Sequence, residues 1–362
     1  MKRIIILLFI VSFVKVQAQS NFSNKEYDNL LASAVENLNQ ADFYFVGQAH
    51  GNQANIIIER DLLLSLNHKF NVRYYILEYG QSLAFLLNQY LETGQDSILN
   101  FINSKGNFDL VKTIKGFNDT IPDLRKIKFF GVDFENRLDG KWTKKAIEII
   151  SDKIKLADNH PLQILLNAVI NQEPKPEKEN LNELATYLKN NEQNCRTLLG
   201  KYYVDVLLIS NSQFAFSPKR DKAMFDNFKL LYSELTRIEK NPKFFASFGF
   251  AHVNPENKNG LPYRLLEDGD SPIKGKVSVI GAQYYNCTFK VETPTIGPVG
   301  TLSSLCKNSA VKDMDSSNDT KAKTITFFSK NELTKFACKK ALNKLDAILI
   351  IRNFNANSSW AF

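Results

Sequence analysis

The feature that most constrains the fold is an alternation of short apolar runs with longer stretches of helical spacing. The apolar runs are four or five residues long and rich in β-branched and aromatic side chains: Phe43–Gly47, Tyr74–Leu77, Phe129–Val132, Phe244–Phe248, Val277–Ile280 and Ala347–Ile351. Such runs are typical of strands buried on both faces. Apolar residues recur at helical spacing over Ile56–Asn67 and Leu83–Leu91, and a further helical segment covers Lys25–Asn39. This alternation predicts an α/β fold whose central sheet is mixed, mostly parallel, and covered by helices on both faces.

Two segments depart from this alternation. Residues 142–203 are rich in Leu, Lys, Glu and Asn and are interrupted by the polar stretch Gln172–Pro176. They predict a helical insertion with a flexible linker, inside one α/β domain that spans residues 19–362. Residues 292–323 are rich in Thr, Ser, Pro, Gly and Asp, and we expect them to form long surface loops before the last strand.

The amino terminus has the pattern of a secretory signal peptide. Lys2 and Arg3 precede an apolar run over residues 4–14, and Val16–Ala18 supplies a cleavage site of small-residue type. The alternative is an uncleaved anchor, but the run is about half the length that a bilayer requires. We therefore expect cleavage after Ala18, export to a periplasm or the medium, and no stable membrane insertion afterwards.

Charge and cysteine content limit the partners and the cross-links. The chain carries 46 Lys and Arg against 38 Asp and Glu, a modest excess without the dense basic stripe of a nucleic-acid-binding protein. A small-molecule substrate is the expected partner. In an oxidising compartment the four cysteines form one or two disulfides or stay as thiols, and both alternatives remain open. They are Cys195, Cys287, Cys306 and Cys338.

Polar side chains follow four of the predicted strands, where each strand ends. They are His50, Glu78, Asp133 and His252. In an open α/β sheet, ligands bind beyond the carboxyl ends of the strands, so we expect these four side chains to converge. A neutral imidazole accepts a proton from water near neutral pH, and a carboxylate holds the ring in the required tautomer. The combination indicates activation of water.

Three further residues are candidates for supporting roles. Arg60 lies on the first predicted helix after His50, where it would stabilise an oxyanion; the alternative is a solvated helix arginine. Arg220 and Asp221 open a later helix and either orient a catalytic group or anchor that helix. The sequence has no G-x-S-x-G, G-x-G-x-x-G, Walker or H-E-x-x-H motif, which argues against several common hydrolase and nucleotide-binding mechanisms.

Several of these motifs, in this order, resemble those of the erythromycin esterase family. The matching segments are Phe45–Gly51, Ile76–Glu78, Leu87–Gly94, Phe130–Asp133, Arg220–Asn227, Ala251–Val253 and Leu345–Leu349. The resemblance implies an α/β fold with a helical accessory part, and ester hydrolysis by water without a metal or other cofactor. It implies that His50 is the general base, that Glu78 and Asp133 shape the site, and that Arg60 and His252 bind or polarise the substrate.

The chain departs from the family pattern at Gln48, where a Glu is usual. An amide orients water or substrate but is not a base, so we expect Gln48 to bind substrate together with Asp133, Arg220 and Asp221. The Gln48–His50 spacing is one residue shorter than in the esterases. This shorter spacing is closer to the one found in a wider superfamily, which contains haem-binding iron-uptake lipoproteins and Tiki-type metalloproteases.

That superfamily supplies two alternatives to the esterase. One is an envelope protein that binds haem or another ligand, with Tyr74, Tyr75 and Tyr79 as aromatic contacts or as a phenolate ligand. The other is a peptidase whose histidines and carboxylates hold a divalent metal.

Overall fold

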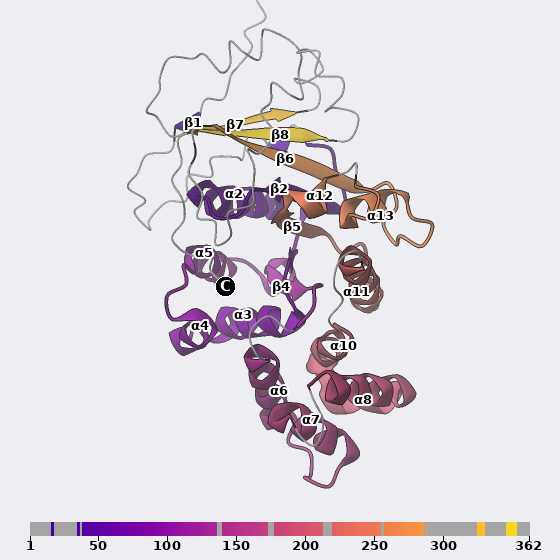
Figure 1. Ribbon diagram of the computed structural model, residues 1–362. Helices are drawn as coiled ribbons and strands as arrows, with labels where there is room; N and C mark the ends of the chain where they lie inside the picture. The colour runs from indigo at the N-terminus through magenta and orange to yellow at the C-terminus, as the bar shows by residue number, and fades with distance from the viewer. Residues whose placement is uncertain are drawn as a thin grey trace, which may run out of the picture.

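The computed structural model describes residues 16–17, 35–36, 38–135, 140–172, 177–212, 219–254, 257–285, 287, 324–329 and 345–352. Eight strands in these ranges form one sheet, in the order β1-β7-β8-β6-β2-β5-β3-β4 (Figure 1). Their bounds are β1 Val16–Gln17, β2 Phe43–Gln48, β3 Tyr74–Leu77, β4 Lys128–Gly131, β5 Phe244–Gly249, β6 Val277–Tyr285, β7 Thr324–Ser329 and β8 Ala347–Arg352.

The sheet is mixed and mostly parallel, as the sequence predicts. Strands β8, β6, β2, β5, β3 and β4 pair in parallel, whereas β7 is antiparallel to β8 and β1 is antiparallel to β7. All six predicted strands are present, and β3 has the predicted bounds. Strands β1 and β7 were not anticipated, and the two-residue β1 falls within the predicted signal peptide.

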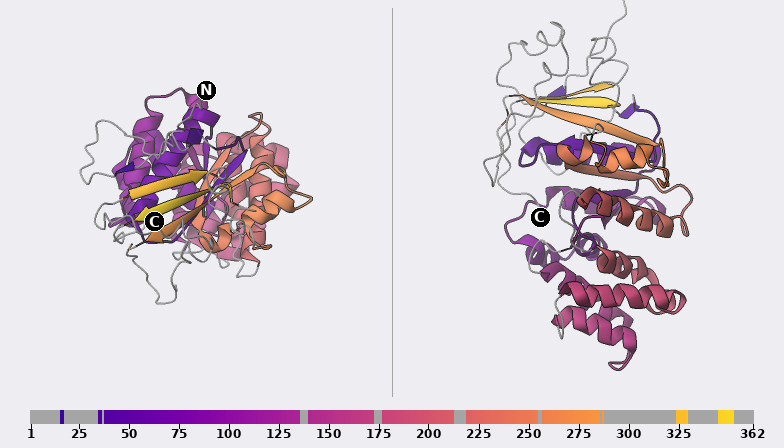
Figure 2. Two further views of the ribbon diagram at one scale, coloured as in Figure 1. Left: turned by 90° about the horizontal axis from the view of Figure 1, so that it is seen from above. Right: turned by 45° about the vertical axis from the view of Figure 1, so that its right-hand side comes forward.

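Side chains of the buried strands alternate between two apolar clusters, one on each face of the sheet. On β2, Tyr44 and Val46 face the cluster that contains α2, whereas Phe43 and Phe45 face the cluster that contains α11. Every residue of β2 and β5 is buried, which accounts for their unbroken apolar runs. The α/β prediction, with helices on both faces, is confirmed (Figure 2).

The helices that flank the sheet include those expected after the first two strands. The expected stretch Ile56–Asn67 lies within α2, and Leu83–Leu91 lies within α3. The helices are α2 Gln53–Phe70, α3 Gln81–Thr93, α4 Asp96–Asn103, α5 Asp109–Asn118, α6 Lys141–Ile154, α7 Pro161–Asn171, α8 Glu177–Asn190, α9 Glu192–Leu199, α10 Tyr203–Asn211, α11 Arg220–Leu235, α12 Phe250–Val253 and α13 Leu261–Glu267.

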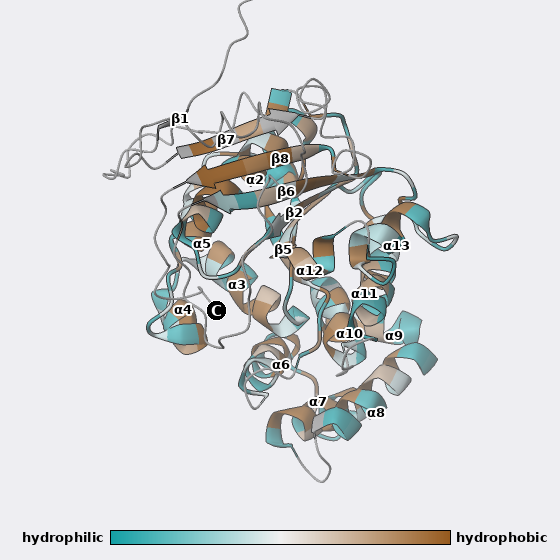
Figure 3. Cartoon of the chain, turned by 45° about the horizontal axis from the view of Figure 1, so that its top comes forward, coloured by the Kyte–Doolittle hydropathy of each residue, from teal (hydrophilic) through white to brown (hydrophobic). Residues whose placement is uncertain are grey.

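The segment expected to be a helical insertion, residues 142–203, carries nearly all of α6 and the whole of α7, α8 and α9, and α10 begins at its last residue. Helix α6 packs against α3 and α7, and α8 packs against α7 and α10. These helices extend beyond the β4 end of the sheet, away from β7 and β8 (Figures 1 and 2). Much of α8 is hydrophilic, whereas β8 is strongly apolar (Figure 3). The insertion therefore packs on the rim of the α/β layer and leaves the centre of the sheet to α2 and α11.

Some predictions fall outside the described residues. They include the loop-rich segment 292–323, Cys306 and Cys338 with any disulfide they form, and most of Lys25–Asn39. Cys195 is a buried thiol, and Cys287 Sγ donates to the Ile351 carbonyl at 3.6 Å. Within the described part of the chain, none of the helices combines the length and apolar character needed to cross a bilayer.

Candidate active site

The predicted site residues emerge from four strands that are neighbours in the sheet. Strands β2, β5, β3 and β4 lie side by side and run in parallel, so their carboxyl ends share one edge. His50 follows β2, Glu78 follows β3, Asp133 follows β4, and His252 lies in α12, directly after β5. Arg220 and Asp221 begin α11, and their side chains reach the residues at the same edge.

The Glu78 carboxylate lies between the two imidazoles. Glu78 Oε2 is 4.0 Å from His50 Nε2, and Glu78 Oε1 is 3.6 Å from His252 Nε2. The Gly249 N–H also donates to Oε2, at 2.9 Å. Burial by itself raises the pKa of Glu78, but the two imidazoles, this N–H and the Arg220 cation outweigh it and lower that pKa. Glu78 is therefore ionised, and a proton gained by either ring is stabilised by it.

Arg220 holds the buried carboxylates together. Its Nε donates to both oxygens of Asp133 at 3.0 and 3.1 Å, and its Nη2 donates to Asp133 Oδ2 and, at 3.1 Å, to Glu78 Oε1. The Asp133 side chain is 1% exposed. Burial alone lowers the pKa of Arg220, but its bonds to Asp133 and the nearby carboxylates raise it. The guanidinium is thus a fixed positive charge, and Asp133 acts on the site through it.

His252 is oriented at both ring nitrogens. Its Nδ1 lies 2.9 Å from Asp221 Oδ1, and its Nε2 lies 3.2 Å from Arg220 Nη1. Because a guanidinium only donates, the neutral ring carries its proton on Nδ1 and accepts at Nε2. If the ring gained a second proton, at Nε2, that N–H would face Glu78 Oε1, which lies 3.6 Å away. The bond to Asp221, ahead of the opposing effect of burial, raises the pKa of His252. Of the two roles considered for Asp221, orienting a catalytic group and anchoring α11, this contact fits the first.

His50 is the most exposed member of the cluster. Its side chain is 42% exposed, against 20% for His252 and 11% for Glu78. The ring lies directly over Gly249, because a Cβ at that residue would stand 2.6 Å from His50 Nε2. The absence of a side chain at Gly249 therefore leaves the space that the His50 imidazole occupies. Of the two imidazoles, that of His50 is the more accessible to solvent.

The backbone just before His50 is held by two side chains from other elements. The Ala49 N–H donates to the Tyr284 hydroxyl at 3.3 Å, and Asn55 Nδ2 donates to the Ala49 carbonyl at 2.7 Å. Tyr284 in turn donates to Asn55 Oδ1 at 2.5 Å. Asn52 caps α2 by accepting from the Ala54 N–H at 2.9 Å. The loop that carries His50 is thus pinned to both β6 and α2.

Two predicted site residues, Arg60 and Gln48, form their observed hydrogen bonds with residues outside the cluster of His50, Glu78, Asp133 and His252. Arg60 Nε donates to Asp61 Oδ1 at 2.5 Å, so its observed ion pair is with its own helix. Gln48 is buried, and its Nε2 donates to Glu59 Oε1 at 3.2 Å. An oxyanion-stabilising role for Arg60 and direct substrate binding by Gln48 stay predictions.

Sequence reasoning missed Glu59, a buried carboxyl beneath the His50 loop. Its Oε2 accepts from the Tyr75 hydroxyl at 2.8 Å, while its Oε1 accepts from Gln48. Burial raises the pKa of Glu59 to about 7. The sequence did contain a sign of this. Glu59 lies next to the apolar stripe Ala54, Ile58 and Leu62, which forms the buried face of α2, so a carboxylate at position 59 was a candidate for burial.

Two of the three tyrosines considered as haem ligands are engaged in the interior. Tyr74 and Tyr75 are buried, and their hydroxyls donate to Glu239 and Glu59. Burial raises the pKa of both, which disfavours a phenolate. These two side chains do not fit a haem ligand.

The cluster is also not built as a metal site. Among the residues that the structure describes, no group of three or more His, Cys, Asp or Glu side chains is arranged to hold a metal ion. The Arg220 guanidinium occupies the position between Glu78, Asp133 and His252 that a cation would need. The donor set therefore fits an internal arginine.

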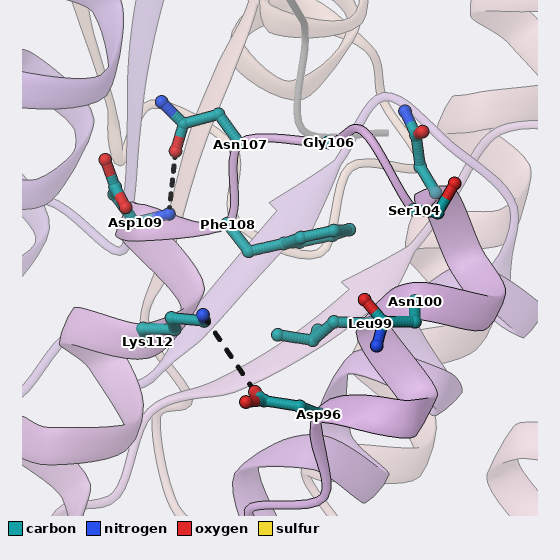
Figure 4. Close-up of a pocket in the computed structure, with 10 residues that line it drawn as sticks. Asp96, Leu99, Asn100, Ser104, Gly106, Asn107, Phe108, Asp109 and Lys112 are labelled. Carbon is teal, nitrogen blue, oxygen red and sulfur yellow. Dashed lines mark hydrogen bonds and ion pairs between the residues drawn. The ribbon is translucent and has the colours of Figure 1, made fainter.

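A separate cavity of about 380 Å³ lies between α4 and α5 (Figure 4). Polar side chains dominate its lining. Lys112 Nζ lies 3.9 Å from Asp96 Oδ1, and Asn107 Oδ1 accepts from the Asp109 N–H at 2.9 Å. Its lining includes no member of the histidine–carboxylate cluster, so it is distinct from the candidate active site.

Comparisons with known proteins support the fold. The sequence matches no protein-family model and no curated protein. Among solved structures, the chain is similar to a Bacillus cereus protein with a TM-score of 0.64 and 15% identity, over 95% of this chain and 96% of that one. A succinoglycan biosynthesis protein gives 0.61 and 14%, over 94% and 95%.

The third similar structure is an erythromycin esterase variant in its open conformation. It gives a TM-score of 0.54 and 11% identity, over 91% of this chain and 95% of that one. The TM-scores establish a common fold, and at identities this low they establish nothing more; the erythromycin-esterase-like fold expected from the sequence motifs is confirmed.

Proposed function

We propose that this protein is a hydrolase that cleaves a carboxylic ester with water activated by His50. The observation that carries the proposal is the placement of one ionised carboxylate, Glu78, between an exposed and a half-buried imidazole. An exposed neutral ring can accept a proton from water, and the adjacent negative charge stabilises the imidazolium that forms. The shared fold with an erythromycin esterase supports the same reaction class.

In the proposed reaction, His50 accepts one proton from water as the water oxygen bonds to the acyl carbon. The electron pair of the carbonyl bond moves to oxygen and gives a tetrahedral oxyanion. Collapse of this intermediate breaks the ester C–O bond, and the leaving alkoxide takes the proton from His50. The products are a carboxylic acid and an alcohol, and the imidazole returns to its neutral form.

Arg220 is the arginine best placed to stabilise the oxyanion. Its Nη1 faces His252, and the Arg220 side chain is 18% exposed. Preorganised positive charge in a partly desolvated site is effective, because it requires no reorganisation during the reaction. The same role for Arg60 would require its guanidinium to leave Asp61.

The test compares His50→Ala with His68→Ala, an exposed histidine in the last turn of α2. Purified variants are offered p-nitrophenyl esters of graded chain length and a macrolide lactone. We expect hydrolysis by the wild type and by His68→Ala, and a loss of roughly a hundredfold or more in His50→Ala. A wild type that cleaves no ester, or a His50→Ala variant that retains its rate, would reject the proposal.

We also infer that residues 1–18 direct export. The basic start, short apolar run and Ala18 support this inference. Amino-terminal sequencing of the protein recovered from the periplasm or medium should begin at Gln19. Recovery of the full-length chain from the cytoplasm alone would contradict it.

A further inference from the structure

We propose that Glu59 is a positioning residue whose proton decides which end of the Gln48 amide faces His50. This inference rests on the proposed function, because it concerns how the water-activating histidine is surrounded. It starts from an ionisable group that the proposed reaction does not use. Glu59 lies on the buried face of α2, and two donors converge on its carboxylate, Gln48 Nε2 at 3.2 Å and the Tyr75 hydroxyl at 2.8 Å.

Sheet register places the Gln48 side chain next to the His50 ring. Gln48 pairs with Gly249 across the β2–β5 ladder, so a side chain at either position would leave the same face of the sheet. Paired positions on adjacent strands lie about 4.8 Å apart. His50 occupies the side-chain position of Gly249, since a Cβ there would meet its Nε2. The amide and the imidazole are therefore neighbours above β2 and β5.

The free end of the amide is an acceptor in the observed state. Gln48 Oε1 is buried and accepts no hydrogen bond from the described part of the protein, whereas Nε2 is held by Glu59. An ionised Glu59 offers only acceptors, so it binds the NH₂ end and leaves Oε1 as the atom that the amide presents on the side of His50. The charge on Glu59 thus sets the polarity that the amide presents to the imidazole.

Protonation of Glu59 reverses this polarity. A carboxylic acid must donate its O–H, and the Gln48 amide satisfies it by rotating so that Oε1 faces Glu59. The NH₂ end then turns toward His50, where it presents a donor in place of an acceptor. An acceptor beside the ring stabilises the imidazolium that forms when His50 takes a proton from water, whereas a donor opposes it. The ionised state of Glu59 is therefore the one that suits water activation.

The groups around Glu59 leave it as the member of this network that titrates near neutrality. Among the described residues, the titratable groups that face it are Tyr75 of β3 and Tyr284 of β6, and burial raises the pKa of each above its ordinary value. Ser247 of β5 and Tyr75 stabilise the ionised carboxylate, although burial dominates and raises the Glu59 pKa to about 7. The proposed reorientation thus falls within the physiological pH range.

The test follows the side-chain amide of Gln48 by NMR in protein labelled with ¹⁵N-glutamine, with the resonance assigned by its loss in Gln48→Leu. In the wild type we expect the signal to shift with a midpoint near pH 7. Glu59→Gln should abolish that transition. Tyr75→Phe removes a donor to the carboxylate and should move the midpoint to higher pH. Asp205→Asn is the control, because Asp205 forms a similar, partly buried carboxylate–amide pair with Gln81 at 2.7 Å.

The second part of the test measures the kinetics of ester hydrolysis. Glu59→Gln should lower kcat for ester hydrolysis at pH 8 by roughly five- to tenfold with KM little changed, as expected for one misdirected hydrogen bond. A Gln48 signal that titrates unchanged in Glu59→Gln would overturn the inference. If the signal behaves as expected while no form of the protein cleaves esters, the amide switch stands and the proposed function fails.

Discussion

Removing the Arg220 cation should destabilise the protein by about 3–5 kcal/mol, because it leaves a buried carboxylate without its partner. In Arg220→Met, Asp133 loses the guanidinium that now donates to both of its oxygens, and Glu78 loses one donor. Solvent can screen little of this change, since the two side chains of the pair are 18% and 1% exposed. The loss is large relative to the roughly 5–15 kcal/mol that separates folded from unfolded domains.

Urea denaturation followed by circular dichroism would measure this change. The control Lys222→Met lies on the same helix and breaks an exposed ion pair with Asp226, so it should cost less than about 1 kcal/mol. Adding Asp133→Asn to Arg220→Met removes the unpaired charge and should recover more than half of the loss. The reasoning would be refuted if Arg220→Met cost no more than Lys222→Met, or if Asp133→Asn gave no recovery.

Three further predictions concern the histidines and Glu59. Gly249→Ala should displace the His50 ring, since the new Cβ would lie 2.6 Å from Nε2; esterase kcat should fall at least about tenfold while urea denaturation shows a loss of about 1–3 kcal/mol. Asp221→Asn removes the partner of Nδ1 and should lower the pKa of His252, which an NMR titration of the ring would show directly. The raised pKa of Glu59 means that folding favours its proton, so this stabilisation is present at low pH and is lost as pH rises from about 4.5 to about 7. Relative to Glu59→Gln, the wild type should lose about 3 kcal/mol across that window, and equal pH profiles of unfolding would contradict the assignment.

Local sequence patterns were sufficient to locate the strands of the central sheet. Tyr74–Leu77 has the predicted bounds, and the structure extends Phe43–Gly47 by one residue, because a strand buried on both faces must be apolar throughout. Four side chains at strand ends were expected to converge, and Glu78 does lie against both histidines. That expectation depended only on the rule that parallel strands present their carboxyl ends at one edge.

Long-range pairing could not be obtained in the same way. The position of β5 between β2 and β3 follows from contacts across the whole chain, and no local pattern specifies it. Arg60 was chosen for its nearness to His50 in sequence, yet its ion pair is with Asp61, while Glu59 one residue earlier faces the interior. A helix rotates by about 100° per residue, so an error of one position exchanges the inner face for the outer one.

The order of strands in the sheet also bears on how the chain is made. Strand β5 separates β2 from β3, and the Gly249 N–H that reaches Glu78 comes from 171 residues further along the chain. During synthesis β3 can pair early with β4, but β2 has no neighbouring strand until residue 249 has been made, because both of its partners, β5 and β6, come later in the chain. Such distant pairing makes folding slow and leaves apolar edges exposed meanwhile, so the nascent polypeptide should depend on chaperones. The same delay would keep the nascent chain unfolded, which is the state that the proposed export through a translocation channel requires.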